Sequence, residues 1–185
     1  MDIAGWERMY RSGERGQEDA PTRLLVETCA KLTPGTAIDL ACGAGRNAIY
    51  LAEQGWRTTA VDGSGSAIQK LCQRAAERNI GITARVADLT SPAFALPADS
   101  YDLVVIAFYL QRDLFARVKP SMRDGGTLVA IVHTPELGEP PTDKRAARGE
   151  LLELLAGWEI LHSYEGPSRD PAHRRPVAEV VARRC

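Results

Sequence analysis

The sequence predicts a doubly wound α/β fold with a mostly parallel sheet of seven strands and an antiparallel pair of strands at its C-terminal edge. Three observations favour this fold. Short apolar runs alternate with segments of helical apolar spacing, as in right-handed βαβ units. The run YDLVVIA at 101–107 is apolar almost throughout, which is typical of a strand buried on both faces. The last two apolar runs have no helix between them, which favours antiparallel pairing.

The first half of the chain is predicted from apolar spacing and from the residues that end each run. Residues 1–21 form a polar lead-in that we interpret as a capping arm. A helix at 22–32 ends at Pro34-Gly35, a helix at 46–54 ends at Gly55, and a strand at 56–61 is closed by Asp62-Gly63. The remaining elements expected here are strands at 36–41 and 82–86 and a helix at 66–78.

The second half continues the alternation and ends in strands alone. A helix at 110–119 follows the buried strand and ends at Pro120, and Gly125-Gly126 turns into the next strand. The other elements expected are strands at 127–132, 158–164 and 177–182 and a helix at 144–156. We expect 135–149 to contain a flap, and the loop at 166–176 is too long and proline-rich for a tight hairpin turn.

Size and composition restrict the function classes. A chain of 185 residues, 44% hydrophobic and 25% charged, predicts one globular domain at 1–185 that needs no disulfide or structural metal. With 23 basic and 24 acidic residues, the net charge of −1 gives no global field for nucleic acid. No apolar run reaches the roughly 20 residues of a membrane span. The polar start and four widely spaced cysteines predict a cytoplasmic protein with free thiols, and three scattered histidines predict no metal site.

The segment DLACGAGRNA at 39–48 carries the strongest functional signal. Its glycines allow a tight turn between strand and helix, with backbone N–H groups free to meet a ligand. Asp62, 23 positions after Asp39, ends the next strand and can accept both hydroxyls of a ribose. A simple packing turn, or a nicotinamide or flavin dinucleotide site, fits the same glycines. Asp39 favours a ligand with an ammonium group, because a carboxylate there repels a pyrophosphate.

With these residues the chain resembles the class I S-adenosylmethionine-dependent methyltransferases, whose fold is Rossmann-like. The motifs that carry the resemblance span about 33–131: DLACGAG at 39–45, VDGS at 61–64, ADL at 87–89, YDLVV at 101–105 and GGTL at 125–128. The segments GRNAIYLA at 45–52, FYLQR at 108–112 and WERMYRSG at 6–13 are similar to a small tellurite-resistance-like group within that class.

The resemblance implies S-adenosyl-L-methionine as cofactor and assigns its contacts. Asp39 and the Gly43 and Gly45 backbone would hold the methionine moiety, with Asn47 beside them, and Asp62 would hold the ribose. The adenine would lie against Asp88 and the Leu89 backbone, and Ala107 and Phe108 would face the sulfonium. A turn or cap role for Asp88 before Thr90 is the alternative. Trp6 and Tyr10, four residues apart, would close as a lid or simply pack the arm onto the core.

The acceptor is not identified by any motif. The N/D-P-P-[YF] signature of amino-group methyltransferases is absent after the fourth strand. The acceptor-pocket candidates are Tyr109, Arg112 and His133. Of these, His133 would be a general base, an anion donor or a strand-end histidine. Arg112 would bind an anionic acceptor or form a salt bridge with Asp113 or a glutamate elsewhere.

Methyl transfer to a small molecule by in-line displacement is therefore the predicted activity, carried out by a monomer or homodimer. A nucleic-acid acceptor is disfavoured, because the arginine-rich C-terminal segment lacks aromatic residues for base stacking. Two alternatives stay open at this point. A nicotinamide-dependent oxidoreductase would need room for a substrate domain, and a non-catalytic binding protein would need no catalytic residue.

Overall fold

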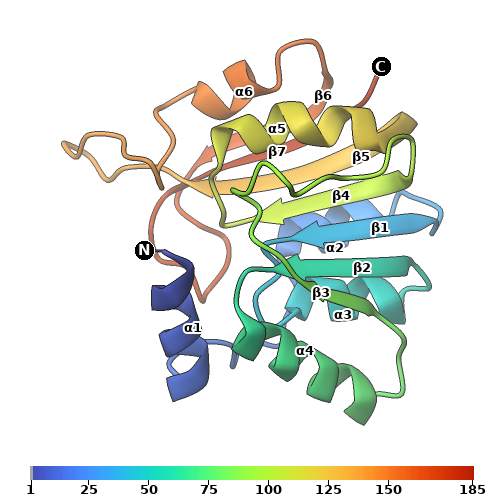
Figure 1. Ribbon diagram of the computed structural model, residues 1–185. Coiled ribbons are helices and arrows are strands. Elements are labelled where there is room, and N and C mark those ends of the chain that lie inside the picture. Colours follow the sequence, from blue (N-terminus) through green and yellow to red (C-terminus); the bar gives the residue numbers. More distant parts are fainter. Residues whose placement is uncertain (1) are drawn as a thin grey trace.

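The computed structural model, which describes residues 2–185, contains one sheet of seven strands (Figure 1). The strands are β1 (Thr36–Leu40), β2 (Arg57–Asp62), β3 (Thr83–Val86), β4 (Tyr101–Ala107), β5 (Met122–His133), β6 (Glu159–Gly166) and β7 (Val177–Arg183). Their spatial order is β3-β2-β1-β4-β5-β7-β6. The first five strands are parallel, and β7 runs antiparallel to both β5 and β6. The predicted fold class is confirmed, including the antiparallel pair at the edge.

Helices cover both faces of the sheet. On one face lie α2 (Arg23–Cys29), α3 (Arg46–Glu53) and α4 (Gly65–Glu77), and on the other lie α5 (Arg112–Val118), the 3₁₀ turn η1 (Lys119–Ser121) and α6 (Glu150–Leu154). The remaining helix, α1 (Ile3–Ser12), covers neither face. Figure 1 shows it on the side of the sheet where the arrowheads of the parallel strands lie.

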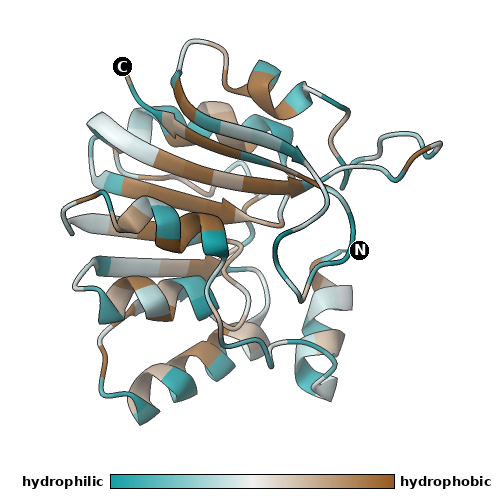
Figure 2. Cartoon of the chain, turned by 180° about the vertical axis from the view of Figure 1, so that it is seen from behind, coloured by the Kyte–Doolittle hydropathy of each residue, from teal (hydrophilic) through white to brown (hydrophobic). Residues whose placement is uncertain are grey.

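The core is divided by the pleat of the central strands. In β4, Leu103 and Val105 pack in the cluster under α2 and α3, whereas Val104 and Ile106 pack in the cluster under α5 and α6. Figure 2 shows the apolar colour concentrated on the central strands and on the inner sides of the helices. Because β4 is buried on both faces, its sequence is an almost unbroken apolar run rather than an alternating one.

Two expected elements differ from the structure. The strand expected at 127–132 begins at Met122, because the chain continues through Gly125, whose positive φ of 75° lets its N–H reach the Arg184 carbonyl. The helix expected at 144–156 is wrong except for the short α6. Residues before α6 are held elsewhere: Thr142 and Arg145 form a bridge, and the Ala146 N–H binds the His133 carbonyl. Gly149, at a φ of 79°, then starts the helix late.

The strand order reverses between β1 and β4. Their following segments therefore leave in opposite directions at the carboxyl ends of the strands, the region where doubly wound sheets bind ligands. We call this region the crevice. The connection from β3 to β4, residues 87–100, contains no helix, as Figure 1 shows. Within residues 2–185, none of the helices is both long and apolar enough to cross a bilayer.

Candidate functional site

The glycine loop joins β1 to α3 at the crevice. Ala41 and Phe108, which follow β1 and β4 directly, both have positive φ values, 56° and 60°, although neither is a glycine. Such strained backbone is typical of functional sites. Gly43 and Gly45 also have positive φ values, 56° and 83°. A Cβ on Gly43 would overlap the Tyr10 hydroxyl, and one on Gly45 would overlap the Leu71 side chain of α4. Glycine is therefore required at both positions.

Asp39 is a buried acid with spare hydrogen-bonding capacity. Its residue is only 1% exposed, and no described residue gives its Oδ2 a hydrogen-bond partner. Burial, together with the negative charge of Asp62, raises the pKa of Asp39 to about 8. A buried carboxyl without a partner is costly, and a cationic ligand would restore the balance. The residue thus fits a group such as the ammonium of an amino acid.

Asp62 ends β2 and braces the glycine loop. Its Oδ2 accepts a hydrogen bond from the Gly43 N–H at 2.8 Å, and its Oδ1 accepts one from the Ser64 N–H at 2.8 Å. Burial raises the pKa of Asp62, and these two N–H groups oppose that rise. Each carboxylate oxygen has a second lone pair. Asp62 can therefore accept ligand hydroxyls while it fixes the loop.

Helix α1 is docked on the segment after β2 by Glu7, a residue that the sequence reasoning missed. The Glu7 carboxylate accepts hydrogen bonds from the Ser64 hydroxyl at 2.6 Å, the Ser66 hydroxyl at 2.6 Å and the Ser66 N–H at 3.0 Å. These hydrogen bonds, that from Ser64 foremost, lower the pKa of Glu7 to about 2. Asp2 caps the helix by accepting from the Gly5 N–H. The spacing of Asp2 and Gly5 is the one signal in the sequence for this helix start.

The two aromatic residues of α1, Trp6 and Tyr10, differ in their burial and in their distance from the glycine loop. Their ring centroids are 6.2 Å apart. Tyr10 is half-buried, with its hydroxyl above Gly43, and burial raises its pKa. Trp6 is exposed. Tyr10 therefore covers the glycine loop, and Trp6 stands beside it.

The segment after β3 places Asp88 and Leu89 near α5. Asp88 Oδ1 accepts hydrogen bonds from the Thr90 N–H at 2.8 Å and the Thr90 hydroxyl at 2.6 Å, and these lower the pKa of Asp88. Leu89 is buried, and its carbonyl accepts from Gln111 Nε2 at 3.0 Å and Arg117 Nη1 at 2.9 Å. The Asp88 side chain thus forms a turn cap, and the backbone of this segment is fixed from α5.

Aromatic rings meet at the ends of β4 and β5. The Phe108 ring stacks on His173 with a centroid distance of 3.5 Å and an interplanar angle of 2°. His133 Nε2 and His173 Nδ1 are 3.2 Å apart, so one imidazole donates and the other accepts. Burial lowers the pKa of both rings, to about 4 for His173. Both histidines are therefore neutral near pH 7. His173 comes from the β6–β7 loop and was not among the expected site residues.

A buried ion pair holds that loop in place. Arg46 Nη2 lies 2.7 Å from Asp170 Oδ2, and the two side chains are only 14% and 8% exposed. The Arg46 guanidinium also lies over the Phe108 ring, 5.5 Å from its centroid. Asp170 accepts from the Ala172 N–H as well, which shapes the turn before His173. Arg46 and Asp170 are 124 positions apart in the sequence, so no local pattern could have predicted that they pair.

Three other expected site residues have partners of their own. Asn47 Oδ1 accepts from the Thr22 N–H at 2.9 Å and so ties α3 to the start of α2. The Tyr109 hydroxyl donates to Gln111 Oε1 at 2.8 Å, and burial raises the pKa of Tyr109 to about 12. Arg112 forms an ion pair with Glu150 and donates to the Thr142 carbonyl. Of the two roles predicted for Arg112, an anionic acceptor site or a salt bridge, this ion pair corresponds to the salt bridge with a glutamate elsewhere in the chain.

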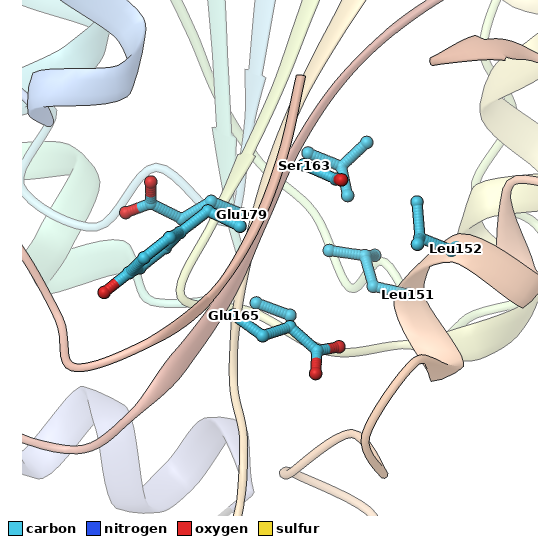
Figure 3. A pocket seen from close by; sticks show the side chains of 8 residues that line it. Leu151, Leu152, Ser163, Glu165 and Glu179 are labelled. Atoms are coloured by element: carbon cyan, nitrogen blue, oxygen red, sulfur yellow. The ribbon is translucent and has the colours of Figure 1, made fainter. Parts of the chain in front are cut away.

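A separate small pocket lies away from these residues, between α6 and the β6–β7 pair. In Figure 3, Leu151 and Leu152 of α6 stand opposite Ser163 and Glu165 of β6, and the Glu179 carboxylate points to the other side of the sheet. Its volume is about 120 Å³, smaller than the ~300 Å³ of ordinary ligand sites. Among residues 2–185, no group of three or more metal-binding side chains gathers at one point. The glycine loop and the buried Asp39, rather than a pocket volume, make the carboxyl ends of the strands the candidate site.

Comparisons with known proteins agree with this geometry. Residues 37–126 match the family model described as a methyltransferase domain. The probable S-adenosyl-L-methionine-dependent methyltransferase TehB of Haemophilus influenzae is 27% identical over 151 residues, which cover 76% of this chain and 52% of that protein. The chain thus spans about half the length of the curated relatives it matches.

Solved structures share the fold. The crystal structure of TehB from Haemophilus influenzae has a TM-score of 0.73 at 24% identity, covering 87% of this chain and 61% of that one. The 1,6-didemethyltoxoflavin-N1-methyltransferase of Burkholderia thailandensis, with bound 1,6-didemethyltoxoflavin and S-adenosylhomocysteine, has a TM-score of 0.73 at 20% identity, covering 98% and 86%.

Proposed function

We propose that the chain is a class I S-adenosylmethionine-dependent methyltransferase, which transfers a methyl group to a small-molecule acceptor at the carboxyl ends of β1, β2 and β4. The match to a methyltransferase domain and the similarity to TehB support this proposal. The observation that carries the proposal is the buried Asp39 carboxyl, whose Oδ2 has no partner among the described residues, placed directly before the glycine loop. An ammonium group on the methionine moiety supplies the missing partner. A pyrophosphate does not, which disfavours the dinucleotide alternative.

The neighbouring residues would hold the rest of the cofactor. Asp62 accepts from the ribose hydroxyls through its second lone pairs, and Asp88 with the Leu89 backbone meets the adenine. Tyr10 on α1 would close the site above Gly43, with Trp6 beside it. When bound, the cofactor supplies a methyl group activated by the positive charge on sulfur. The protein then has to orient the acceptor in line and exclude water.

The acceptor side supports a small molecule that loses a proton. Burial lowers the pKa values of His133 and His173, so both imidazoles are neutral near pH 7. The pKa of His173, about 4, makes it a weak base, which leaves His133 as the candidate base. Phe108 and Tyr109 supply aromatic surface beside it. Arg112 is engaged by Glu150, which gives less support to an anionic acceptor. We therefore favour an acceptor with a thiol, hydroxyl or amine group, and we assign His133 rather than Arg112 as the residue that assists its reaction, by taking up the proton.

The setting of the enzyme is proposed from its charge and its cysteines. The net charge of −1 supports a small molecule over nucleic acid. Four cysteines without a disulfide are typical of a reducing compartment, which supports the cytoplasm. A monomer or a homodimer is consistent with one compact domain.

Calorimetric titration tests the cofactor. S-adenosylhomocysteine is expected to bind and NAD is not. Asp62→Ala should weaken S-adenosylhomocysteine binding by roughly 2–3 kcal/mol, because charge-assisted hydrogen bonds are lost. Glu159→Gln, an exposed change on the edge strand, serves as the control and should bind like wild type. Equal affinity for NAD and S-adenosylhomocysteine would contradict the proposal.

Turnover tests the acceptor. A panel of thiols, hydroxyls, amines and oxyanions is incubated with S-adenosylmethionine, and product S-adenosylhomocysteine is measured. Turnover on a protic acceptor should rise with pH as the acceptor loses its proton more easily, and His133→Ala should lower kcat on that acceptor. Turnover on oxyanions alone, unaffected by His133→Ala, would overturn the assignment of the acceptor class.

A further inference from the structure

The adenine side of the site is built on a segment with little regular structure. Residues 87–100 connect β3 to β4 without a helix, and the backbone hydrogen bonds at the start of this segment include those of local turns, from the Ser91 N–H to the Asp88 carbonyl and from the Phe94 N–H to the Ser91 carbonyl. Asp88 and Leu89 open this segment. A binding surface made of backbone needs something to fix it, since loosely held loops lose affinity through ordering entropy.

One side chain of α5 supplies much of that restraint. The Arg117 guanidinium donates to the Leu89 carbonyl at 2.9 Å, to the Ser91 carbonyl at 3.3 Å and to the Phe94 carbonyl. It also lies over the Phe94 ring, 5.5 Å from the centroid. The planar guanidinium presents several donors in a rigid fork, which a lysine does not. Arg117 therefore binds three carbonyls of the adenine segment, spread over residues 89–94, with one charged group.

A second donor reinforces the same carbonyl. Gln111, at the start of α5, donates from Nε2 to the Leu89 carbonyl at 3.0 Å and accepts from the Tyr109 hydroxyl at 2.8 Å. Asp113 Oδ2 accepts from both Gln111 Nε2 and Arg117 Nη1, at 3.2 and 3.3 Å, and so holds the two donors together. The end of β4, on the acceptor side, is in this way connected to the adenine segment.

We infer that Arg117, assisted by Gln111, is a positioning residue for adenine recognition. In the absence of a helix in this segment, Arg117 fixes the Asp88–Leu89 backbone, where the adenine amine would be bound. The inference rests on the proposed function, because it takes Asp88 and Leu89 as the adenine contacts. Arg117 acts through the carbonyls of the segment, and no cofactor contact is assigned to it. Its loss should therefore reduce discrimination between bases more than it reduces binding of the remainder of the ligand.

Two ligands that differ only in the base test this inference. S-adenosylhomocysteine and S-inosylhomocysteine, in which a carbonyl replaces the adenine amine, are titrated by calorimetry. Wild type should prefer the adenosyl ligand at least about tenfold, the size of one hydrogen bond. Arg117→Gln should lose about tenfold in affinity for the adenosyl ligand and little for the inosyl ligand. Arg117→Lys, which keeps the charge and loses the fork, should show the same loss of preference and guards against misfolding of the first variant.

Amide hydrogen exchange gives a readout that does not depend on ligand. Exchange at residues 87–94 should be faster in Arg117→Gln than in wild type. Arg23→Gln is the matched control, because the Arg23 side chain is 67% exposed and forms an ion pair along its own helix with Glu27. It should change neither the base preference nor the exchange.

The failures are distinguishable. A wild-type protein that binds neither ligand defeats the proposed function. A wild type that discriminates, with Arg117 variants that keep the full preference or lose both ligands equally, defeats only the inference about Arg117.

Discussion

Asp39 shows how a single residue can be unfavourable for the fold and useful for the ligand. Its carboxyl is buried beside a second acid, Asp62, and its pKa is raised to about 8, so the folded chain holds a proton there at neutral pH. A residue chosen for stability alone would be asparagine or an apolar side chain at this position. An acid at this position would be explained by the proposed binding of a positively charged ligand group beside it.

A pH dependence of stability follows from this residue. In the unfolded chain Asp39 has an ordinary pKa of about 3.9, so between about pH 4 and 8 the folded chain holds a proton that the unfolded chain has released. The Asp39 contribution to the free energy of unfolding is therefore full below pH 4 and is lost as the pH rises through 8. Asp39→Asn should lack this decline. Urea unfolding at pH 5 and pH 8 measures the free energy of unfolding of both proteins. An equal change in this free energy between the two pH values in wild type and Asp39→Asn would contradict the raised pKa.

The same residue predicts proton release on cofactor binding. The ammonium group of the ligand favours ionised Asp39, so binding of S-adenosylhomocysteine at pH 7 should expel nearly one proton from wild type. Calorimetry in two buffers of different ionisation enthalpy detects it as a buffer-dependent heat. Asp39→Asn is expected to give a heat that does not depend on the buffer, and a buffer-dependent heat in that variant would assign the proton to another group.

At the scale of elements, α1 is the part of the site that is least fixed by the core. It contacts the domain through Glu7 at the start of α4, through Ile3 over Gly63 and through Tyr10 over Gly43. These contacts fall on the segments proposed to hold the ribose and the methionine moiety. The helix therefore depends on the binding segments for its position, and they depend on it for cover.

Removing the Glu7 contacts should show whether α1 is a cover over the binding site or a structural element of the domain. Glu7→Ala leaves the Ser64 and Ser66 hydroxyls without their carboxylate acceptor, so α1 should open and amide exchange at residues 3–12 should become faster. S-adenosylhomocysteine should bind several-fold more weakly and slow that exchange again. The melting temperature should change little, because α1 adds only Gly5 to the buried residues. Glu14→Ala, an exposed change just after the helix, is the control. An unfolded Glu7→Ala domain would mean that α1 is a structural element and not a lid.

Elements with a strong local signal could be predicted and those held by distant contacts could not. The strand at 101–107 has the expected bounds, because an apolar run buried on both faces has one simple interpretation. The helix expected at 144–156 is mostly irregular, because Ala146 is pinned to the His133 carbonyl and Arg112 binds the carbonyls of Thr142 and Asp143. Those partners lie on β5 and α5, and helical spacing within the segment carries no information about them.

At the scale of the whole molecule, the first and last parts of the chain build the crevice together. The proposed cofactor side is formed by β1, β2 and their following loops, all of which carry recognisable motifs. The acceptor side is formed by β4, β5 and the β6–β7 loop, and there His173 and Asp170 carry no motif. The sequence accordingly predicts the cofactor contacts in detail and leaves the acceptor open. Arg46, one residue after the glycine loop, connects the two sides through Asp170.

This connection can be measured with a double-mutant cycle. Arg46→Met alone leaves the Asp170 carboxylate buried without its partner, and Asp170→Leu alone does the same to the guanidinium, so each should lower the free energy of unfolding by about 3–5 kcal/mol. The double variant replaces a buried ion pair by apolar groups and should lose less than the sum of the two single changes. Urea unfolding measures all four proteins. Arg183→Gln with Glu159→Gln, a pair in which both side chains are more than 40% exposed, forms the control cycle and should show coupling below about 1 kcal/mol. Additive single effects at Arg46 and Asp170 would mean that the β6–β7 loop is held over Phe108 by packing alone, and that the two sides of the crevice are not energetically connected through this ion pair.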